Sequence, residues 1–269
     1  MNLTLRELGR EILAYPEFTE KLQQDQPDPL SIPLVLLHIP KTAGTTLGHL
    51  LKAAHPDAPT LDGLAVAQRL RKMSDAARRD LRLVLGHISH SACQLIPGPK
   101  RLISVLRMPG PRVLSYYEFI ARSPNHPDHA LITQNQLSFG EYLEASKNGN
   151  IRPWLDNTQI RLISGCDSMA WIGREAEIFE IAIANLVAPP MRFGFSEEFD
   201  AFQCELVSEG ILASRSKTRL NVAPVPADLH SALSELSPNQ RIIFDDYIKW
   251  DSWFYDIAYR IKQAGQQGV

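Results

Sequence analysis

The most regular feature of the chain is a set of three short runs that are apolar except for Ser104 in the third. They occupy residues 34–37, 83–85 and 102–106, and prolines or polar residues bound each run. A short continuous apolar run is typical of a strand that is buried on both faces of a parallel sheet. We therefore predict three core strands, and a fourth short strand over residues 191–195.

Apolar residues at helical spacing fill the stretches between and after these runs. The predicted helices cover residues 44–54 and 62–79, a segment after Pro109, and residues 139–146, 175–187, 197–207 and 238–262, the last broken near Asp251. Strands that alternate with helices indicate an α/β fold, with a mostly parallel central sheet flanked by helices.

The first thirty residues predict a separate helical element. Leucine and isoleucine recur there at helical spacing, which indicates an amphipathic helix over residues 4–24 that stops before Pro27. The rest of the 269 residues contains no linker rich in glycine or serine. We predict a helical extension over residues 1–30 and a single domain over residues 31–269.

The composition restricts the classes of partner. There are 28 Lys and Arg against 30 Asp and Glu, a net charge of −2, which argues against binding nucleic acid by bulk charge. No apolar run approaches the ~18 residues of a membrane span, and charged residues interrupt the N-terminal segment, unlike in a signal peptide. Cys93, Cys166 and Cys204 are too widely spaced for a metal knuckle or a disulfide framework. We expect a soluble cytoplasmic protein without nucleic-acid or membrane partners.

Polar side chains follow each of the three predicted strands. His38 and Lys41 follow the first strand, His87 the second and Arg107 the third. The carboxyl ends of parallel strands meet at one edge of the sheet, where ligands of α/β proteins bind. We therefore expect these side chains to converge at that edge.

The segment 38–46, His-Ile-Pro-Lys-Thr-Ala-Gly-Thr-Thr, joins the first strand directly to a predicted helix. Such a turn places backbone N–H groups and a helix N-terminus around one point, which suits a phosphate. It is not a Walker A loop, because Lys41 precedes Gly44 instead of following it. No acidic Mg²⁺ ligand ends a neighbouring apolar strand, so we expect an anion loop without a metal.

Two motifs resemble those of the sulfotransferases that use 3′-phosphoadenosine 5′-phosphosulfate (PAPS), in the branch that includes heparan-sulfate 2-O-sulfotransferase. Residues 38–47 resemble the loop that holds the 5′-phosphosulfate. Arg107 and Ser115, eight residues apart, resemble the Arg and Ser that hold the 3′-phosphate. Weaker similarities extend the resemblance over residues 34–261, among them residues 157–161 and 194–199, and Asp251 with Tyr255. It implies the sulfotransferase fold, which is similar to that of the P-loop NTPases, PAPS as the sulfuryl donor and adenosine 3′,5′-bisphosphate as the product.

The resemblance and the chemistry of sulfuryl transfer together assign roles to individual residues. Lys41 would stabilise the bridging oxygen as negative charge grows on it. His87 would be the general base, with His90 and Glu118 as alternatives, and His38 would stabilise the loop. The expected donor-binding residues are Lys41, Thr42, Ala43, Gly44, Thr45, Thr46, Arg107, Ser115 and Arg219.

The sequence departs from the family in two places. Met108 stands where the family usually has Asp, which would loosen the turn after Arg107. The heparan 2-O enzymes carry His-Gly-His near the base, whereas Leu85-Gly86-His87 keeps the second His alone. The second departure leaves the base and the acceptor sugar open.

Two further features have two interpretations each. The basic segment with Arg215, Lys217 and Arg219 is either a solvated loop or a lid that closes on the nucleotide or on an anionic acceptor. Trp154 and Arg161 are candidates to face a sugar or aromatic acceptor, and the alternative for Trp154 is core packing. A run of arginines and lysines over residues 69–82 indicates a solvated helix face.

The resulting hypothesis is transfer of a sulfuryl group from PAPS to a hydroxyl of a carbohydrate by in-line displacement, without a metal. The alternatives are a nucleotide kinase or NTPase with an atypical loop, and a catalytically silent protein that binds the bisphosphate.

Overall fold

The computed structural model describes residues 32–147, 151–166, 168–188, 191–217, 220 and 228–267. The predicted N-terminal helix and Arg219 lie outside the described residues. Within the described part of the chain, no helix is long and apolar enough to cross a membrane.

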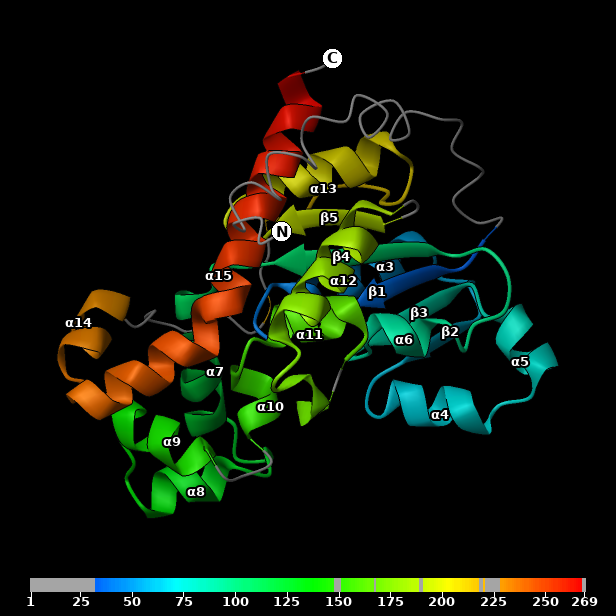
Figure 1. The fold of residues 1–269 in the computed structure, drawn as a ribbon. Coiled ribbons are helices and arrows are strands. Elements are labelled where there is room, and N and C mark those ends of the chain that lie inside the picture. The colour runs from blue at the N-terminus through cyan, green and yellow to red at the C-terminus, as the bar shows by residue number, and fades with distance from the viewer. Residues whose placement is uncertain are drawn as a thin grey trace.

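The centre of the molecule is a parallel sheet of five strands in the order β2-β3-β1-β4-β5 (Figure 1). The strands are β1 (Leu34–Leu37), β2 (Thr60–Asp62), β3 (Leu83–Gly86), β4 (Arg101–Leu106) and β5 (Met191–Phe195). Every neighbouring pair is parallel. The predicted α/β fold with one central sheet is confirmed, and β1, β3 and β4 contain the three apolar runs.

Helices cover both faces of the sheet, and alternate strand residues face each layer. Leu34 and Leu36 of β1 pack toward α3 (Gly44–Ala54) and α13 (Phe199–Ser208). Val35 and Leu37 pack on the opposite side. The elements of that side are α4 (Val66–Lys72), α6 (His90–Cys93), α11 (Thr158–Ser164), η2 (Met169–Trp171), α12 (Glu175–Val187) and the second half of α15 (Pro238–Gln267).

A second, all-helical core lies beside the sheet. It contains buried residues of α7 (Pro109–Ala121), α8 (His129–Gln134), α9 (Phe139–Ser146), α10 (Arg152–Leu155) and the first half of α15, with α14 (Leu229–Ser234) against it. Figure 1 shows α8 and α9 at the lower left, away from the strands. The final helix therefore packs on both cores.

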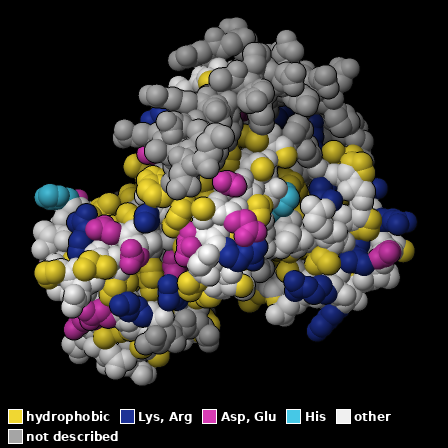
Figure 2. Space-filling view, in the orientation of Figure 1, with side chains coloured by type: hydrophobic (Ala, Val, Ile, Leu, Met, Phe, Trp, Pro, Cys, Tyr) yellow, Lys and Arg dark blue, Asp and Glu magenta, His cyan; other side chains and the backbone are white. Residues whose placement is uncertain are grey.

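The structure divides the helix predicted over residues 62–79. Strand β2 ends at Asp62, at the start of this range, and two separate helices follow it, α4 and α5 (Asp75–Asp80). Helix α4 ends before Met73, whose backbone is extended. The next residue, Ser74, caps the N-terminus of α5, because its hydroxyl accepts a hydrogen bond from the Ala77 N–H. Arg69, Arg71, Lys72 and Arg79 of this region are exposed, as predicted for a solvated face, whereas Arg78 and Arg82 are half-buried. Figure 2 shows Lys and Arg side chains over this end of the molecule.

Helix α15 is bent where the side chain of Asn157 enters it. Asn157 Oδ1 accepts from the backbone N–H groups of Trp250 and Asp251, at 2.8 and 2.9 Å. The Nδ2 group and the backbone N–H of Asn157 donate to the carbonyls of Asp246 and Tyr247. Asn157 thus bonds four backbone groups that a straight helix would bond within itself, and a side chain inserted in this way bends a helix. The bend lies where the break near Asp251 is predicted.

Candidate active site

The loop between β1 and α3 is tightly built. Lys41 and Ala43 have left-handed backbone conformations, with φ of 67° and 70°, which non-glycine residues adopt at a cost. The Thr42 hydroxyl donates to the Ile39 carbonyl at 2.8 Å. No side chain caps α3, and the first N–H groups of a helix are not bonded by the helix itself. The loop therefore presents a helix N-terminus that suits an anion.

Gly44 is required by the close approach of His38. A Cβ atom added at Gly44 would lie 2.0 Å from His38 Cδ2. Burial, followed by the charges of His87 and Lys41, lowers the pKa of His38 to about 3. His38 is therefore a neutral ring that supports the loop, as predicted.

His87 lies directly beside His38, with ring centroids 4.2 Å apart. Its Nδ1 lies 2.6 Å from the His38 carbonyl oxygen. A carbonyl can only accept, so Nδ1 carries the proton and Nε2 of the neutral ring keeps its lone pair. His87 is exposed at the surface, but the protein atoms packed around its ring remove enough water to lower its pKa, and the hydrogen bond to His38 opposes this effect, so the ring is neutral near pH 7. An uncharged imidazole with a free lone pair can accept a proton.

Lys41 completes the loop with a cation. Its Nζ lies 4.3 Å from the centroid of the Phe119 ring. Burial, followed by the charges of Arg122 and Arg107, lowers the pKa of Lys41 to about 8, and Glu118 acts in the opposite direction. Lys41 is therefore mostly charged at pH 7.

Arg107 reaches the same loop from the end of β4. Its Nη1 donates to the Lys41 carbonyl at 2.9 Å, and the residue is half-buried. Gln159 holds its backbone, since Gln159 Oε1 accepts from the Arg107 N–H at 3.0 Å and Nε2 donates to the Arg107 carbonyl at 2.8 Å. The predicted convergence of His38, Lys41, His87 and Arg107 is confirmed.

The turn after Arg107 is held by a residue for which the sequence predicted no role. The Met108 N–H donates to Glu197 Oε1 at 3.0 Å, and the Tyr255 hydroxyl donates to Glu197 Oε2 at 3.2 Å. Glu197 lies just after β5 and supplies a carboxylate at the N-terminus of α7. A carboxylate 89 positions further along the chain therefore holds this turn.

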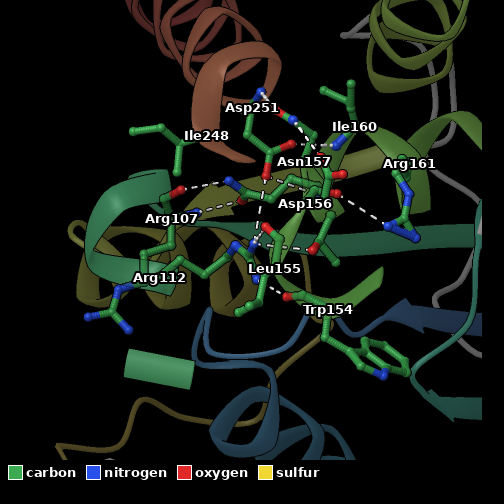
Figure 3. A network of polar contacts seen from close by, with 12 residues as sticks. Arg107, Arg112, Trp154, Leu155, Asp156, Asn157, Ile160, Arg161, Ile248 and Asp251 are labelled. Atoms are coloured by element: carbon green, nitrogen blue, oxygen red, sulfur yellow. Dashed lines mark hydrogen bonds and ion pairs between the residues drawn. The ribbon is translucent and has the colours of Figure 1, made fainter. Parts of the chain in front are cut away.

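A buried polar network lies behind Arg107 (Figure 3). The Asp251 carboxylate accepts from the N–H groups of Gln159 and Ile160, at 3.1 and 2.9 Å, and lies 4.0 Å from Arg112. Arg112 donates to the carbonyls of Trp154 and Leu155 and to the Thr158 hydroxyl. Gln159, Arg112 and Asp251 are fully buried. Sequence reasoning noted residues 157–161 and Asp251 as weak similarities, without a role.

The structure separates Trp154 from Arg161. Arg161 is 1% exposed and donates to the carbonyls of Pro153 and Asp156, so it belongs to the core and does not face an acceptor. Trp154 is half-buried, and its ring lies 6.0 Å from that of His87. Figure 3 shows the Trp154 ring pointing away from the buried network.

The other predicted residues have the following environments. Thr46 Oγ1 accepts from the backbone N–H of Leu220 at 2.9 Å. Ser115 lies half-buried on α7, two turns after Arg107. His90 begins α6, where burial, followed by the charge of Lys100, lowers its pKa. Arg215 Nη1 lies 3.2 Å from Cys204 Sγ.

A cavity of about 790 Å³ lies elsewhere, beside α15. Arg152, Tyr247 and Trp250 are among its lining residues, and no predicted site residue lines it. In the parts of the chain that the structure describes, no three His, Cys, Asp or Glu side chains are grouped to hold a metal ion. Cys93, Cys166 and Cys204 form no disulfides.

No protein-family model and no curated protein matches this chain. Among solved structures, mouse sulfotransferase SULT7A1 complexed with PAP aligns with 94% of this chain and 95% of its own, at 13% identity and a TM-score of 0.44. A likeness of this size carries no argument about function, which has to rest on the residues of the site.

Proposed function

We propose that this protein transfers a sulfuryl group from PAPS to a hydroxyl of a carbohydrate. The observation that carries the proposal is that two groups bond carbonyls of the same loop, His87 at His38 and Arg107 at Lys41. They bring a proton acceptor and a second cation to a turn that already holds Lys41 and the N-terminus of α3. The resemblance of residues 38–47 and of Arg107 with Ser115 to the sulfotransferase motifs supports the same conclusion.

In the proposed complex, the loop residues 42–46 bind the 5′-phosphate of the donor through backbone N–H groups and hydroxyls. Arg107 and Ser115 bind the 3′-phosphate, for which the fixed donors of a guanidinium are well suited. Arg219 is the further cation that we assign to the nucleotide. Leu220, its neighbour in sequence, donates to Thr46 of the loop.

The chemical step is an in-line displacement at sulfur. The acceptor oxygen forms a bond to sulfur while the bond from sulfur to the 5′-phosphate oxygen breaks, and adenosine 3′,5′-bisphosphate leaves. His87 Nε2 takes the proton of the acceptor hydroxyl. Lys41 stabilises the charge that grows on the bridging oxygen, which is a preorganised electrostatic contribution. His90 and Glu118 are the alternative bases.

The acceptor would lie against Trp154. A half-buried indole close to the base offers an apolar ring face, on which the C–H face of a sugar can stack. A hydroxyl at the edge of the same sugar ring would then point to His87. This arrangement favours a carbohydrate over a flexible aliphatic alcohol.

Ligand-dependent melting tests the donor site. Adenosine 3′,5′-bisphosphate at about 100 times its Kd should stabilise the protein by about 2.7 kcal/mol. For a chain of this size that corresponds to a Tm increase of about 5–10 °C. The increase should appear in the presence of EDTA. No increase contradicts the proposed donor site, and an increase that requires Mg²⁺ contradicts it and favours a kinase or NTPase.

Transfer itself is tested with sulfur-labelled PAPS and a panel of acceptors containing desulfated polysaccharides, simple glycosides and phenols. We expect label in a carbohydrate product. Binding of the bisphosphate without transfer to any member of the panel identifies a silent binding protein instead. Transfer confined to phenols retains the reaction and refutes the carbohydrate acceptor.

A further inference from the structure

Three backbone polar groups next to the Cα atom of Arg107 are bonded by side chains from distant segments. Gln159 bonds the Arg107 N–H and the Arg107 carbonyl, at 3.0 and 2.8 Å. Glu197 accepts from the N–H of Met108, at 3.0 Å. The peptide group between Arg107 and Met108 is therefore held at both its carbonyl and its N–H.

Both holding residues are themselves fixed by α15. Asp251 accepts from the backbone N–H of Gln159 at 3.1 Å, and the Tyr255 hydroxyl donates to Glu197 at 3.2 Å. Asp251 and Tyr255 are four residues apart on one helix, so they lie on the same face. One face of α15 thus holds residues 107 and 108 through two separate relays.

The Gln159 relay is the more rigid of the two. Gln159 and Asp251 are both fully buried, and the oxygen and the nitrogen of the Gln159 side-chain amide both bond the Arg107 backbone. If the Arg107 backbone moved, its own N–H and carbonyl and the buried amide of Gln159 would all lose their hydrogen-bond partners. Displacement of Arg107 is therefore unfavourable. Arg107 itself is half-buried and has a long side chain, so its guanidinium direction depends on how firmly its backbone is held.

We propose that Gln159 and Glu197 are positioning residues that aim the Arg107 guanidinium at the 3′-phosphate of the nucleotide, with α15 as their support. This inference rests on the proposed function, because it assigns the 3′-phosphate to Arg107. Its consequence is selective. Loosening either relay weakens the recognition of the 3′-phosphate and leaves the binding of the 5′-phosphate by the loop unchanged.

The quantity to measure is the ratio of the Kd for adenosine 5′-phosphate to the Kd for adenosine 3′,5′-bisphosphate, by titration calorimetry. Gln159→Met keeps the length of the side chain and removes both bonds to Arg107. We expect it to lower the ratio about tenfold, as for the loss of one to two buried hydrogen bonds.

Gln159 belongs to α11, so Gln159→Met could act by destabilising the whole helix. Asn185→Leu is the matched control for such a general effect. The Asn185 amide donates to the Ile163 carbonyl at 2.9 Å, at the end of α11 away from Arg107. The control variant should destabilise the protein and leave the ratio of the two Kd values unchanged. An equal fall of the ratio in both variants means that the effect is general to α11, and it overturns the positioning role.

A second pair of variants tests the Glu197 relay with little risk to folding. Tyr255→Phe removes the hydroxyl that donates to Glu197, and Tyr259→Phe removes one that donates to the neighbouring Glu198 at 3.0 Å. We expect Tyr255→Phe to lower the ratio about threefold and Tyr259→Phe to leave it unchanged. Equal ratios in the two variants overturn the relay. If Gln159→Met does not fold, this pair decides the inference.

Arg107→Ala separates the inference from the function on which it rests. A wild-type protein without preference for the bisphosphate, or a preference that survives Arg107→Ala, refutes the donor site as assigned. If Arg107→Ala removes the preference but Gln159→Met and Tyr255→Phe do not lower it, the donor site stands and the positioning role is refuted. Adding Gln159→Met to Arg107→Ala should change the ratio no further, because both act through one guanidinium. A second tenfold loss overturns the proposal.

Discussion

If Lys41 binds the proposed nucleotide, its lowered pKa should make the affinity depend on pH in a range where the charge of the phosphate groups is constant. With a pKa of about 8, Lys41 is about 90% charged at pH 7 and about 10% charged at pH 9. The phosphate groups titrate near ~6, below this range. As the pH rises from 7 to 9, the affinity for adenosine 3′,5′-bisphosphate should therefore fall about tenfold.

Titration calorimetry at constant ionic strength from pH 7 to 9 measures this dependence without an acceptor. Lys41→Arg is the matched control, because a guanidinium stays charged throughout. Its affinity should be nearly constant over the same range. Wild-type affinity that does not change up to pH 9, or a Lys41→Arg curve of the same shape, refutes the role of the Lys41 charge.

Two neighbours should move the midpoint in opposite directions. Arg122 lowers the pKa of Lys41 and Glu118 raises it. A unit charge ~6–10 Å away contributes about 0.4–0.7 kcal/mol in water, which moves a pKa by about 0.3–0.5. Arg122→Gln should move the midpoint of the affinity curve to higher pH by about this amount, and Glu118→Gln to lower pH. A shift of both variants in one direction contradicts the electrostatic assignment.

Three further variants test the base, the loop and the bend of α15. His87→Ala should lower kcat by ~10²–10⁴ at unchanged bisphosphate affinity. It should also remove the loss of kcat/KM at acidic pH, because only the deprotonated His87, whose pKa lies below its usual value, can accept a proton. If the variant still loses kcat/KM at acidic pH, another residue is the base. Gly44→Ala forces a methyl group against His38 and should reduce the free energy of unfolding by about 1–3 kcal/mol in urea denaturation, and an unchanged midpoint would falsify the contact. Asn157→Leu leaves backbone groups of α15 unsatisfied and should cost about 3–5 kcal/mol by the same method, whereas a loss under about 1 kcal/mol would mean that the helix straightens and bonds itself.

The sequence predicted the elements whose buried residues are apolar and either adjacent in the chain or repeated at helical spacing. Strands β1, β3 and β4 are apolar runs with both faces covered, and helices α9 and α12 have the predicted bounds. Strand β2 was missed because it has three residues at the edge of the sheet, with Leu61 alone buried. Helix α11 was missed because Thr158, Gln159 and Arg161 are buried while polar, so their pattern is that of a surface loop.

The main residues of the site could be predicted for a topological reason. The carboxyl ends of parallel strands share one edge, so residues just after β1, β3 and β4 had to meet. The residues that hold them could not be predicted, because Gln159 and Glu197 are 52 and 89 positions from their backbone partners. Pairings at such separations depend on how helices dock, which no local pattern encodes.

The support of the site by α15 also sets the order in which the site can form during synthesis. A chain made from its amino end contains all five strands by Phe195, but Asp251 follows 56 residues later. At about 5–20 residues per second, this interval lasts about 3–11 s. During this time the nascent chain already contains the loop of residues 38–46 and Arg107, while Asp251, whose carboxylate bonds Gln159, has not yet been made. The capacity to distinguish a 3′-phosphate is therefore the last property of the proposed site that the growing chain can acquire.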